Sequence, residues 1–153
     1  MNIIDTAIKN WTAVNDKMRS YQYLKEILND IDAATFIIDA NANQQLYEQG
    51  VNALGVSIAS YAPYKPFTIA VKKQKGQPTD RVTLRDTGDF ERSFHLKIGR
   101  ESFIVTADDW KTDELMDKYG KIFGLTNENK AKLCQQYIKP DLILRIKNEI
   151  SNG

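Results

Sequence analysis

The segment from Arg81 to Phe94, Arg-Val-Thr-Leu-Arg-Asp-Thr-Gly-Asp-Phe-Glu-Arg-Ser-Phe, constrains the fold more than any other stretch of the chain. Val82 and Leu84 alternate with polar residues, a pattern that is typical of a half-buried strand. The polar triplet Asp86-Thr87-Gly88 then ends the alternation. The sequence therefore predicts a strand over residues 81–84 that stops at a tight turn.

The turn itself is predicted by the side chains of Asp86 and Thr87, which can bond their own backbone, and by Gly88, which adopts a positive φ at no steric cost. Phe90 and Phe94 follow at helical spacing, and we expect both rings to point inward. On residue chemistry alone, this segment is a structural turn with two apolar anchors.

A β-hairpin follows directly after the turn. Residues 93–97 and 102–106 alternate apolar and polar side chains, and residues 98–101 supply a turn that contains Gly99. Together with residues 81–84, at least three strands form an antiparallel sheet, and such a sheet needs a helix over its apolar face. We therefore expect an α+β fold, in which a small antiparallel sheet of three to five strands packs against N- and C-terminal helices.

The first helix is predicted over residues 3–19, with Asn2 as its cap. Its apolar residues recur at three- and four-residue steps: Ile4, Ala7, Ile8, Trp11, Val14 and Met18. The pattern continues from Tyr23 to Ile31. We interpret residues 1–32 as a helical arm of a single domain, residues 1–153, and the arm can pack on its own domain or on a neighbouring copy.

The C-terminal part predicts a helix that begins after Thr126, a good N-cap residue. Pro140 interrupts this helix or starts a new one, which carries a final apolar stripe. Cys134 lies in the apolar pattern and is expected to be a small core residue. It is the single cysteine, so the chain can form no internal disulfide.

Two stretches have conflicting patterns. Residues 33–49 combine a strand-like Phe36-Ile37-Ile38 with a helix-like run that ends at Gly50, a typical helix stop. Residues 67–75 alternate as a strand does, yet they follow a proline-containing bend. The state of both stretches stays open.

The formal net charge of +1 offers no global field that would attract DNA or a membrane. No apolar run approaches the roughly 20 residues that span a bilayer. A local excess of basic residues lies in the 65–81 segment, which holds a single acid, Asp80. Its basic residues are Lys65, Lys72, Lys73, Lys75 and Arg81. This segment contacts DNA or an acidic partner, or it is a solvated loop.

The sequence carries little catalytic chemistry. One histidine, His95, and one cysteine cannot make a His/Cys zinc site, and the acids from Asp108 to Asp117 lack the spacing of a calcium loop. We therefore expect no catalytic residue, metal or cofactor. The Asp86-Thr87-Gly88 triplet also occurs in aspartic proteases, but those enzymes need two facing carboxylates, and charged residues follow the triplet here.

Three motifs resemble segments of the virion-morphogenesis proteins of tailed bacteriophages, the group that includes tail-completion and head–tail joining proteins. The pattern Leu-x-x-Thr-Gly-x-(Leu/Phe)-x-x-Ser-(Phe/Ile) is matched by Leu84, Thr87, Gly88, Phe90, Ser93 and Phe94. An aromatic residue, a proline bend and Thr-x-x-x-Lys-Lys precede it, at Tyr61, Thr68, Lys72, Lys73 and Gly76. Residues 123–129, Phe-Gly-Leu-Thr-Asn-Glu-Asn, match the third motif.

The resemblance covers about residues 44–150, and it is best over 61–94 and 119–133. One departure is Tyr119-Gly120, where many relatives have Tyr-Ala-x-x-His. The resemblance implies a non-enzymatic component of the virion, assembled in the cytoplasm of a bacterial host. It also implies a homo-oligomer, such as a hexameric ring, that contacts connector or portal-side proteins and tail proteins, with DNA passing nearby and no membrane partner.

We expect the partner contacts to come from residues 61–80 and from helix ends. The candidate contact residues are Tyr61, Tyr64, Lys65, Lys72, Lys73 and Lys75. The alternative function is a nucleic-acid-binding accessory protein that uses the basic 65–81 segment, and a third is a protease that depends on Asp86.

Overall fold

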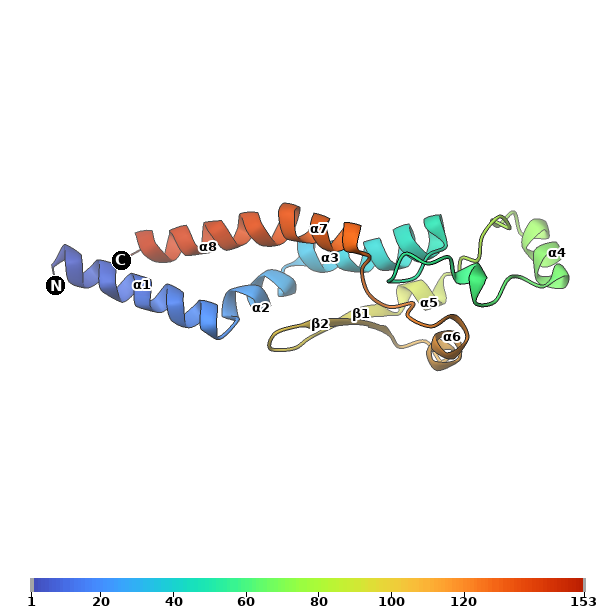
Figure 1. The fold of residues 1–153 in the computed structure, drawn as a ribbon, viewed down its shortest axis with the longest axis horizontal. Helices are drawn as coiled ribbons and strands as arrows, with labels where there is room; N and C mark the ends of the chain where they lie inside the picture. Colours follow the sequence, from blue (N-terminus) through green and yellow to red (C-terminus); the bar gives the residue numbers. More distant parts are fainter. Residues whose placement is uncertain (1, 153) are drawn as a thin grey trace.

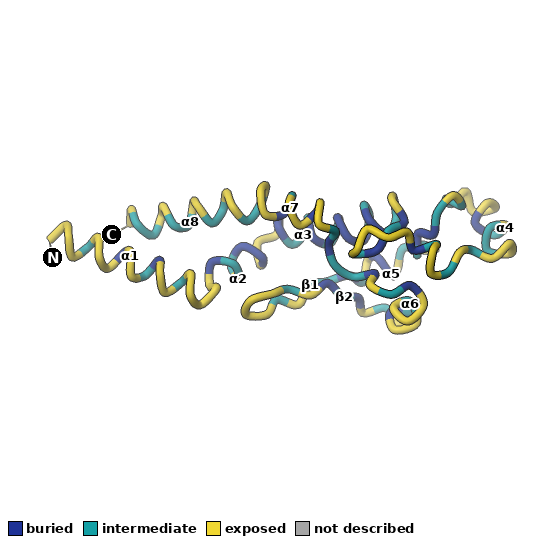
Figure 2. Tube along the Cα trace, viewed as in Figure 1, coloured by how far each residue is buried: buried dark blue, intermediate teal, exposed yellow. Residues whose placement is uncertain are grey.

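The computed structural model describes residues 2–152, and it shows an elongated molecule of mixed helix and strand (Figure 1). Both chain ends lie at one end of the long axis, and helix α4 lies at the other end. Buried residues gather in the middle of the molecule, whereas the part that carries the chain ends is largely exposed (Figure 2).

Helices α1 (Ile3–Arg19) and α8 (Lys139–Ser151) form the exposed part, which we call the arm. The predicted cap of α1 is confirmed, because the Asn2 side chain accepts a hydrogen bond from the Asp5 amide at 2.9 Å. The two helices of the arm contact each other within the chain, because the side-chain amide of Asn10 donates to the carbonyl of Ile150 at 2.9 Å.

The chain then forms α2 (Gln22–Asn29), α3 (Ile31–Asp39) and a π-helical segment, η1 (Ala40–Gln49). Residues 33–49 are therefore helical throughout, and the strand-like reading of Phe36-Ile37-Ile38 is wrong. Ile37 is fully buried in the core, so the apolar run reflects a buried helix face. Gly50 ends η1 with φ +64°, which confirms the predicted helix stop.

A second long helical stretch consists of α7 (Asn127–Leu133), the π-helical η3 (Cys134–Ile138) and α8. The Thr126 side chain caps α7 through the Asn129 amide, as predicted. The π-helical turn lies just before Pro140, where a proline lacks an N–H and its ring crowds the preceding turn. Cys134 is exposed on η3, so its predicted place in the core is wrong.

The sheet has two strands within residues 2–152, β1 (Phe94–Ile98) and β2 (Phe103–Ala107), which pair antiparallel with Leu96 opposite Val105. The predicted hairpin is confirmed, and the prediction of three to five strands is wrong. The sheet packs against α2 and α3.

Residues 81–84 do not form the predicted strand. The Thr83 amide donates to the Tyr64 hydroxyl at 3.0 Å, and just beyond this stretch the Lys72 ammonium donates to the Arg85 carbonyl at 2.7 Å. Leu84 has φ +57°, which breaks the extended conformation.

Short elements complete the chain: η2 (Ile58–Ser60), α4 (Pro66–Gln74), α5 (Asp89–Arg92) and α6 (Thr112–Tyr119). Residues 67–75, which the sequence left open, are thus largely helical. Pro66 occupies the first turn of α4, where its fixed φ favours the helix and no N–H is missed.

Two buried amide side chains of η1 hold the loop that precedes α7. Asn41 donates to the Ile122 carbonyl at 2.9 Å and accepts from the Gly124 amide at 2.8 Å. Gln45 donates to the Gly124 carbonyl and accepts from the Thr126 amide, both at 2.9 Å. Asn41 and Gln45 are fully buried, and they supply the partners that the loop backbone would otherwise lack.

We expect Gln45→Leu to lower the free energy of unfolding by about 3 kcal/mol, because it leaves buried backbone groups of the loop without partners. Gln49→Leu, at an exposed position of the same helical segment, is the control and should change it by less than about 0.5 kcal/mol. Urea denaturation measures both, and equal effects would contradict this role of Gln45.

Gly50 and Gly76 provide a matched pair, since their φ values are +64° and +65°. A Cβ at Gly50 would lie 3.0 Å from the Val82 carbonyl oxygen, whereas a Cβ at Gly76 would have no neighbour within 4 Å. Both alanine variants should be destabilised by about 1 kcal/mol of backbone strain, and Gly50→Ala should lose at least about 1 kcal/mol more. Thermal unfolding tests the difference, and an equal loss would contradict the close approach.

Candidate assembly surfaces

The Thr87-Gly88 turn leads directly into a segment whose aromatic side chains are buried in the core. Gly88 has φ +86° and begins α5, which places Phe90 and Phe94 in the core, as predicted. Their ring centroids lie 5.0 Å apart in an edge-to-face arrangement, and Phe123 packs 5.1 Å from Phe94. The Thr87-Gly88 turn is therefore an anchor of the fold in this chain.

Asp86, next to this turn, is held by an ion pair. Its carboxylate lies 2.6 Å from the Lys75 ammonium, and Gln77 donates to the Asp86 carbonyl at 2.8 Å. The hydrogen bond from Lys75 lowers the pKa of Asp86. Because a protease dyad needs one carboxyl group that stays protonated, this geometry disfavours an acid role for Asp86.

Arg85 joins three segments, and sequence reasoning did not find it. Its guanidinium lies 3.7 Å from the centroid of the Tyr47 ring, within 3.2 Å of the Glu91 carboxylate and within 2.5 Å of the Asn43 side-chain oxygen. The second oxygen of Glu91 is buried without a hydrogen-bond partner in the described chain. No periodicity signals such a cluster, because its members are far apart in the sequence.

Three of the five basic side chains of the 65–81 segment bind acceptors within the chain. Lys72 is buried over the Tyr64 ring and donates to Gln77 as well as Arg85. Lys75 pairs with Asp86, and Arg81 pairs with Asp80 at 2.7 Å and donates to the Tyr47 carbonyl. These side chains stabilise the loop, so they offer less charge to DNA than the sequence suggests.

The exposed part of this segment lies at the end of the molecule that carries α4. We define the tip surface as Lys65, Phe67 and Lys73, all exposed, with Phe67 79% accessible. Among the predicted contact residues, Tyr61 is 47% accessible, and its hydroxyl accepts a hydrogen bond from the buried Asn52. Tyr64 is half-buried, because its hydroxyl binds Thr83.

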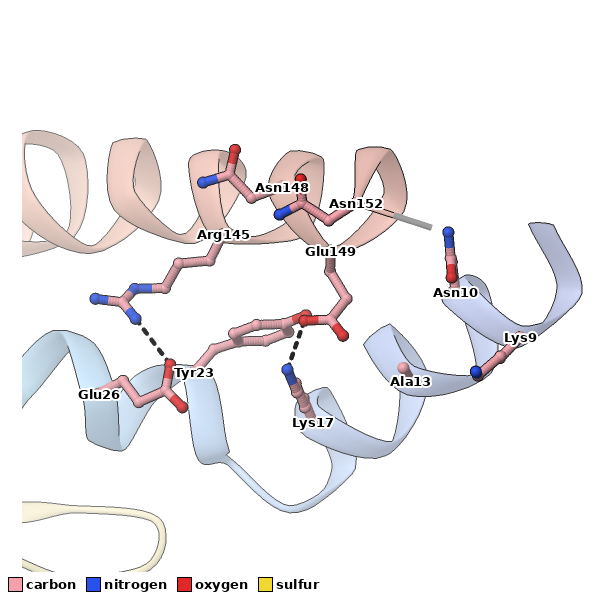
Figure 3. A pocket seen from close by; sticks show the side chains of 10 residues that line it. All are labelled: Lys9, Asn10, Ala13, Lys17, Tyr23, Glu26, Arg145, Asn148, Glu149 and Asn152. Carbon is pink, nitrogen blue, oxygen red and sulfur yellow. Dashed lines mark hydrogen bonds and ion pairs between the residues drawn. The ribbon is translucent and has the colours of Figure 1, made fainter. Parts of the chain in front are cut away.

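At the opposite end, a polar pocket of about 500 Å³ separates α1 from α8 (Figure 3). Lys17 pairs with Glu149 across it, and Arg145 pairs with Glu26 of α2 at 2.7 Å. The Tyr23 hydroxyl is buried beside these pairs and has no hydrogen-bond partner among residues 2–152, and burial raises its pKa. The side of α1 that faces α8 is thus largely polar.

The apolar side of α1 is left uncovered. Its large apolar side chains are exposed to solvent, with relative accessibilities of 88% for Ile3, 68% for Ile4, 60% for Ile8, 57% for Trp11 and 46% for Met18. The amphipathic helix predicted for residues 3–19 is confirmed, yet only Asn10 and Val14 are buried against the chain. Contiguous exposed apolar surface of this kind marks an interaction site.

Comparisons with protein-family models, with curated proteins and with solved structures find no match for this chain. No cluster of three or more potential metal ligands occurs among residues 2–152. The helices of this same stretch include none with the length and apolarity needed to cross a membrane.

Lys72 and Lys73 are adjacent, but Lys72 is buried and binds groups within the chain, whereas Lys73 is exposed. Replacing each in turn separates a role in stability from a role at the surface. Lys72→Ala should lower the free energy of unfolding by about 2 kcal/mol, because the Arg85 carbonyl and the Gln77 side-chain oxygen both lose the ammonium of the buried Lys72 as donor. Lys73→Ala should leave it unchanged within about 0.5 kcal/mol. Urea denaturation of both variants tests this, and a neutral Lys72→Ala would contradict the structural role of Lys72.

Proposed function

We propose that this protein is a structural morphogenesis component of a tailed bacteriophage or prophage. It acts as a tail-completion or head–tail connector protein, and its activity is oligomeric assembly rather than catalysis. Two lines support the proposal: the resemblance of residues 61–94 and 119–133 to that group, and the exposure of large apolar side chains at both ends of an elongated chain.

The observation that carries the proposal is the uncovered apolar side of α1. Trp11 and Ile8 are each more than half accessible, although α8 lies alongside and could have buried them. A chain that works alone would gain about 1.5–3 kcal/mol for each such side chain that it buried. The orientation of α1 is accounted for if another protein covers this side.

The tip surface supports a second contact. Phe67 is 79% accessible, and Lys65 and Lys73 are exposed on the same short helical segment, so this end of the chain offers an apolar side chain and positive charge to an acidic or amphipathic partner. An elongated subunit with one contact region at each end can bridge two neighbours, as a connector must.

This function can be tested on phage particles purified from the bacterium that carries the gene. We expect mass spectrometry to find the protein in density-gradient-purified tailed particles, and deletion of its gene to yield separate heads and tails. Complementation with Phe67→Ser should restore joining less well than complementation with the wild-type gene. Complementation with Gln74→Ser, at another exposed position of α4, serves as the control. Normal particles after deletion, together with absence of the protein from them, would contradict the proposal.

A further inference from the structure

The uncovered side of α1 has the spacing of a coiled-coil seam. Its members succeed one another at steps of four, three, four and three residues: Ile4, Ile8, Trp11, Asn15 and Met18. We call these residues the arm seam. Alternating steps of three and four keep such residues facing a partner helix, and a single polar residue in such a seam sets its register.

Within the part of the chain that the structure describes, no other element covers the arm seam. The helix α8 covers a different side of α1, where Asn10 bonds the Ile150 carbonyl and Lys17 pairs with Glu149. The seam side instead borders a shallow hollow of about 510 Å³, which α1 residues alone line. The usual arrangement of an amphipathic helix is thus reversed, with the polar side toward the protein and the apolar side toward solvent.

We propose that the arm seam binds the arm seam of a second copy of this chain, with the two α1 helices antiparallel. The inference deepens the proposed function, on which it rests, by naming the partner of this surface.

Charge selects the antiparallel orientation. The residues that flank the seam on its solvent side are Asp5, Thr12 and Arg19, spaced by seven. Asp5 and Arg19 are exposed, and neither forms an ion pair within the described residues. In an antiparallel pair this flank faces its own copy, so Asp5 meets Arg19 of the second copy and the same contact forms again across the two-fold axis.

A parallel pair loses this complementarity. There, the flank faces Ala7 and Val14 of the partner, which carry no charge, and Val14 is already buried within its own chain. Only the antiparallel pair therefore brings the two opposite charges of this flank together.

The same register orders the seam itself. Ile8 packs against Met18 of the second copy, and Trp11 packs against Asn15 of the second copy. The indole N–H of Trp11 can then donate to the Asn15 side-chain oxygen, which gives both polar groups a partner. A shift by one heptad would place Asn15 against Ile4 and would separate Asp5 from Arg19.

The arrangement also fits the shape of the molecule. The arm forms one end of the long axis, so antiparallel pairing of two arms lets the two bodies extend in opposite directions (Figure 1). A 17-residue helix is about 25 Å long, and its contact is smaller than the roughly 800 Å² per partner of a standard interface. We therefore expect a dimer with a dissociation constant of roughly 10 μM to 1 mM.

Charge reversal tests the orientation. We expect Asp5→Arg and Arg19→Asp each to weaken self-association by about tenfold in sedimentation equilibrium, and the double variant to restore it. Asp16→Arg, on α1 away from the seam, is the control and should leave association unchanged. Trp11→Ala should also weaken association, and circular dichroism verifies that each variant keeps its helix content.

Cross-linking tests the register in a Cys134→Ser background. A short bis-maleimide should link Thr12→Cys to its own copy and Asp5→Cys to Arg19→Cys in a mixture, whereas Asp16→Cys should give little product. A monomer at all concentrations, association that the reversals leave unchanged, or equal cross-linking at residue 16 would overturn the inference. If the protein is found in purified particles, the proposed function stands even when these tests show no seam dimer. If the protein is absent from particles, the proposed function fails, whereas a dimer measured in solution still stands.

Discussion

The buried hydrogen bonds between η1 and the loop over residues 122–126 are the interaction on which the rest of the structure depends. Asn41 and Gln45 lie one turn apart in fully buried positions, and they pair with the backbone at Ile122, Gly124 and Thr126. Gln45 also accepts from the side chain of Asn129, inside α7. The start of the C-terminal helical stretch is thereby fixed against the end of the N-terminal one, and this sets the direction in which both continue.

The arm and the tip extend from this centre in opposite directions, and each is held by polar contacts. Lys17 and Glu149 connect the arm helices, while Lys72, Tyr64 and Thr83 connect α4 to the irregular segment that precedes the turn. At both ends, polar side chains face the rest of the molecule and bind one another. Apolar side chains such as Trp11 and Phe67 face solvent instead. This division accounts for an elongated chain with a small core and an exposed apolar region at each end.

Much of the local structure could be predicted from the sequence, because it depends on neighbouring residues. The caps at Asn2 and Thr126, the stop at Gly50 and the hairpin all follow from local chemistry. The strand predicted at residues 81–84 was wrong, because the Thr83 amide donates to Tyr64, distant in sequence, and Leu84 has a positive φ. The basic segment was misleading for the same reason: the partners of Lys72 and Lys75 are visible only in the folded chain.

Part of the candidate surface on α1 could be predicted from the sequence. Periodicity identified the helix and its apolar side, but the choice between packing in cis and packing on a neighbour depended on which side α8 covers. The structure places the polar side against α8 and leaves the apolar side accessible, which is why we propose a partner for it. The most direct measurement is light scattering of the wild-type protein over a concentration series. We predict a mass that rises from the 17.5 kDa of one chain toward twice that value, whereas a constant 17.5 kDa at millimolar concentration would contradict the account.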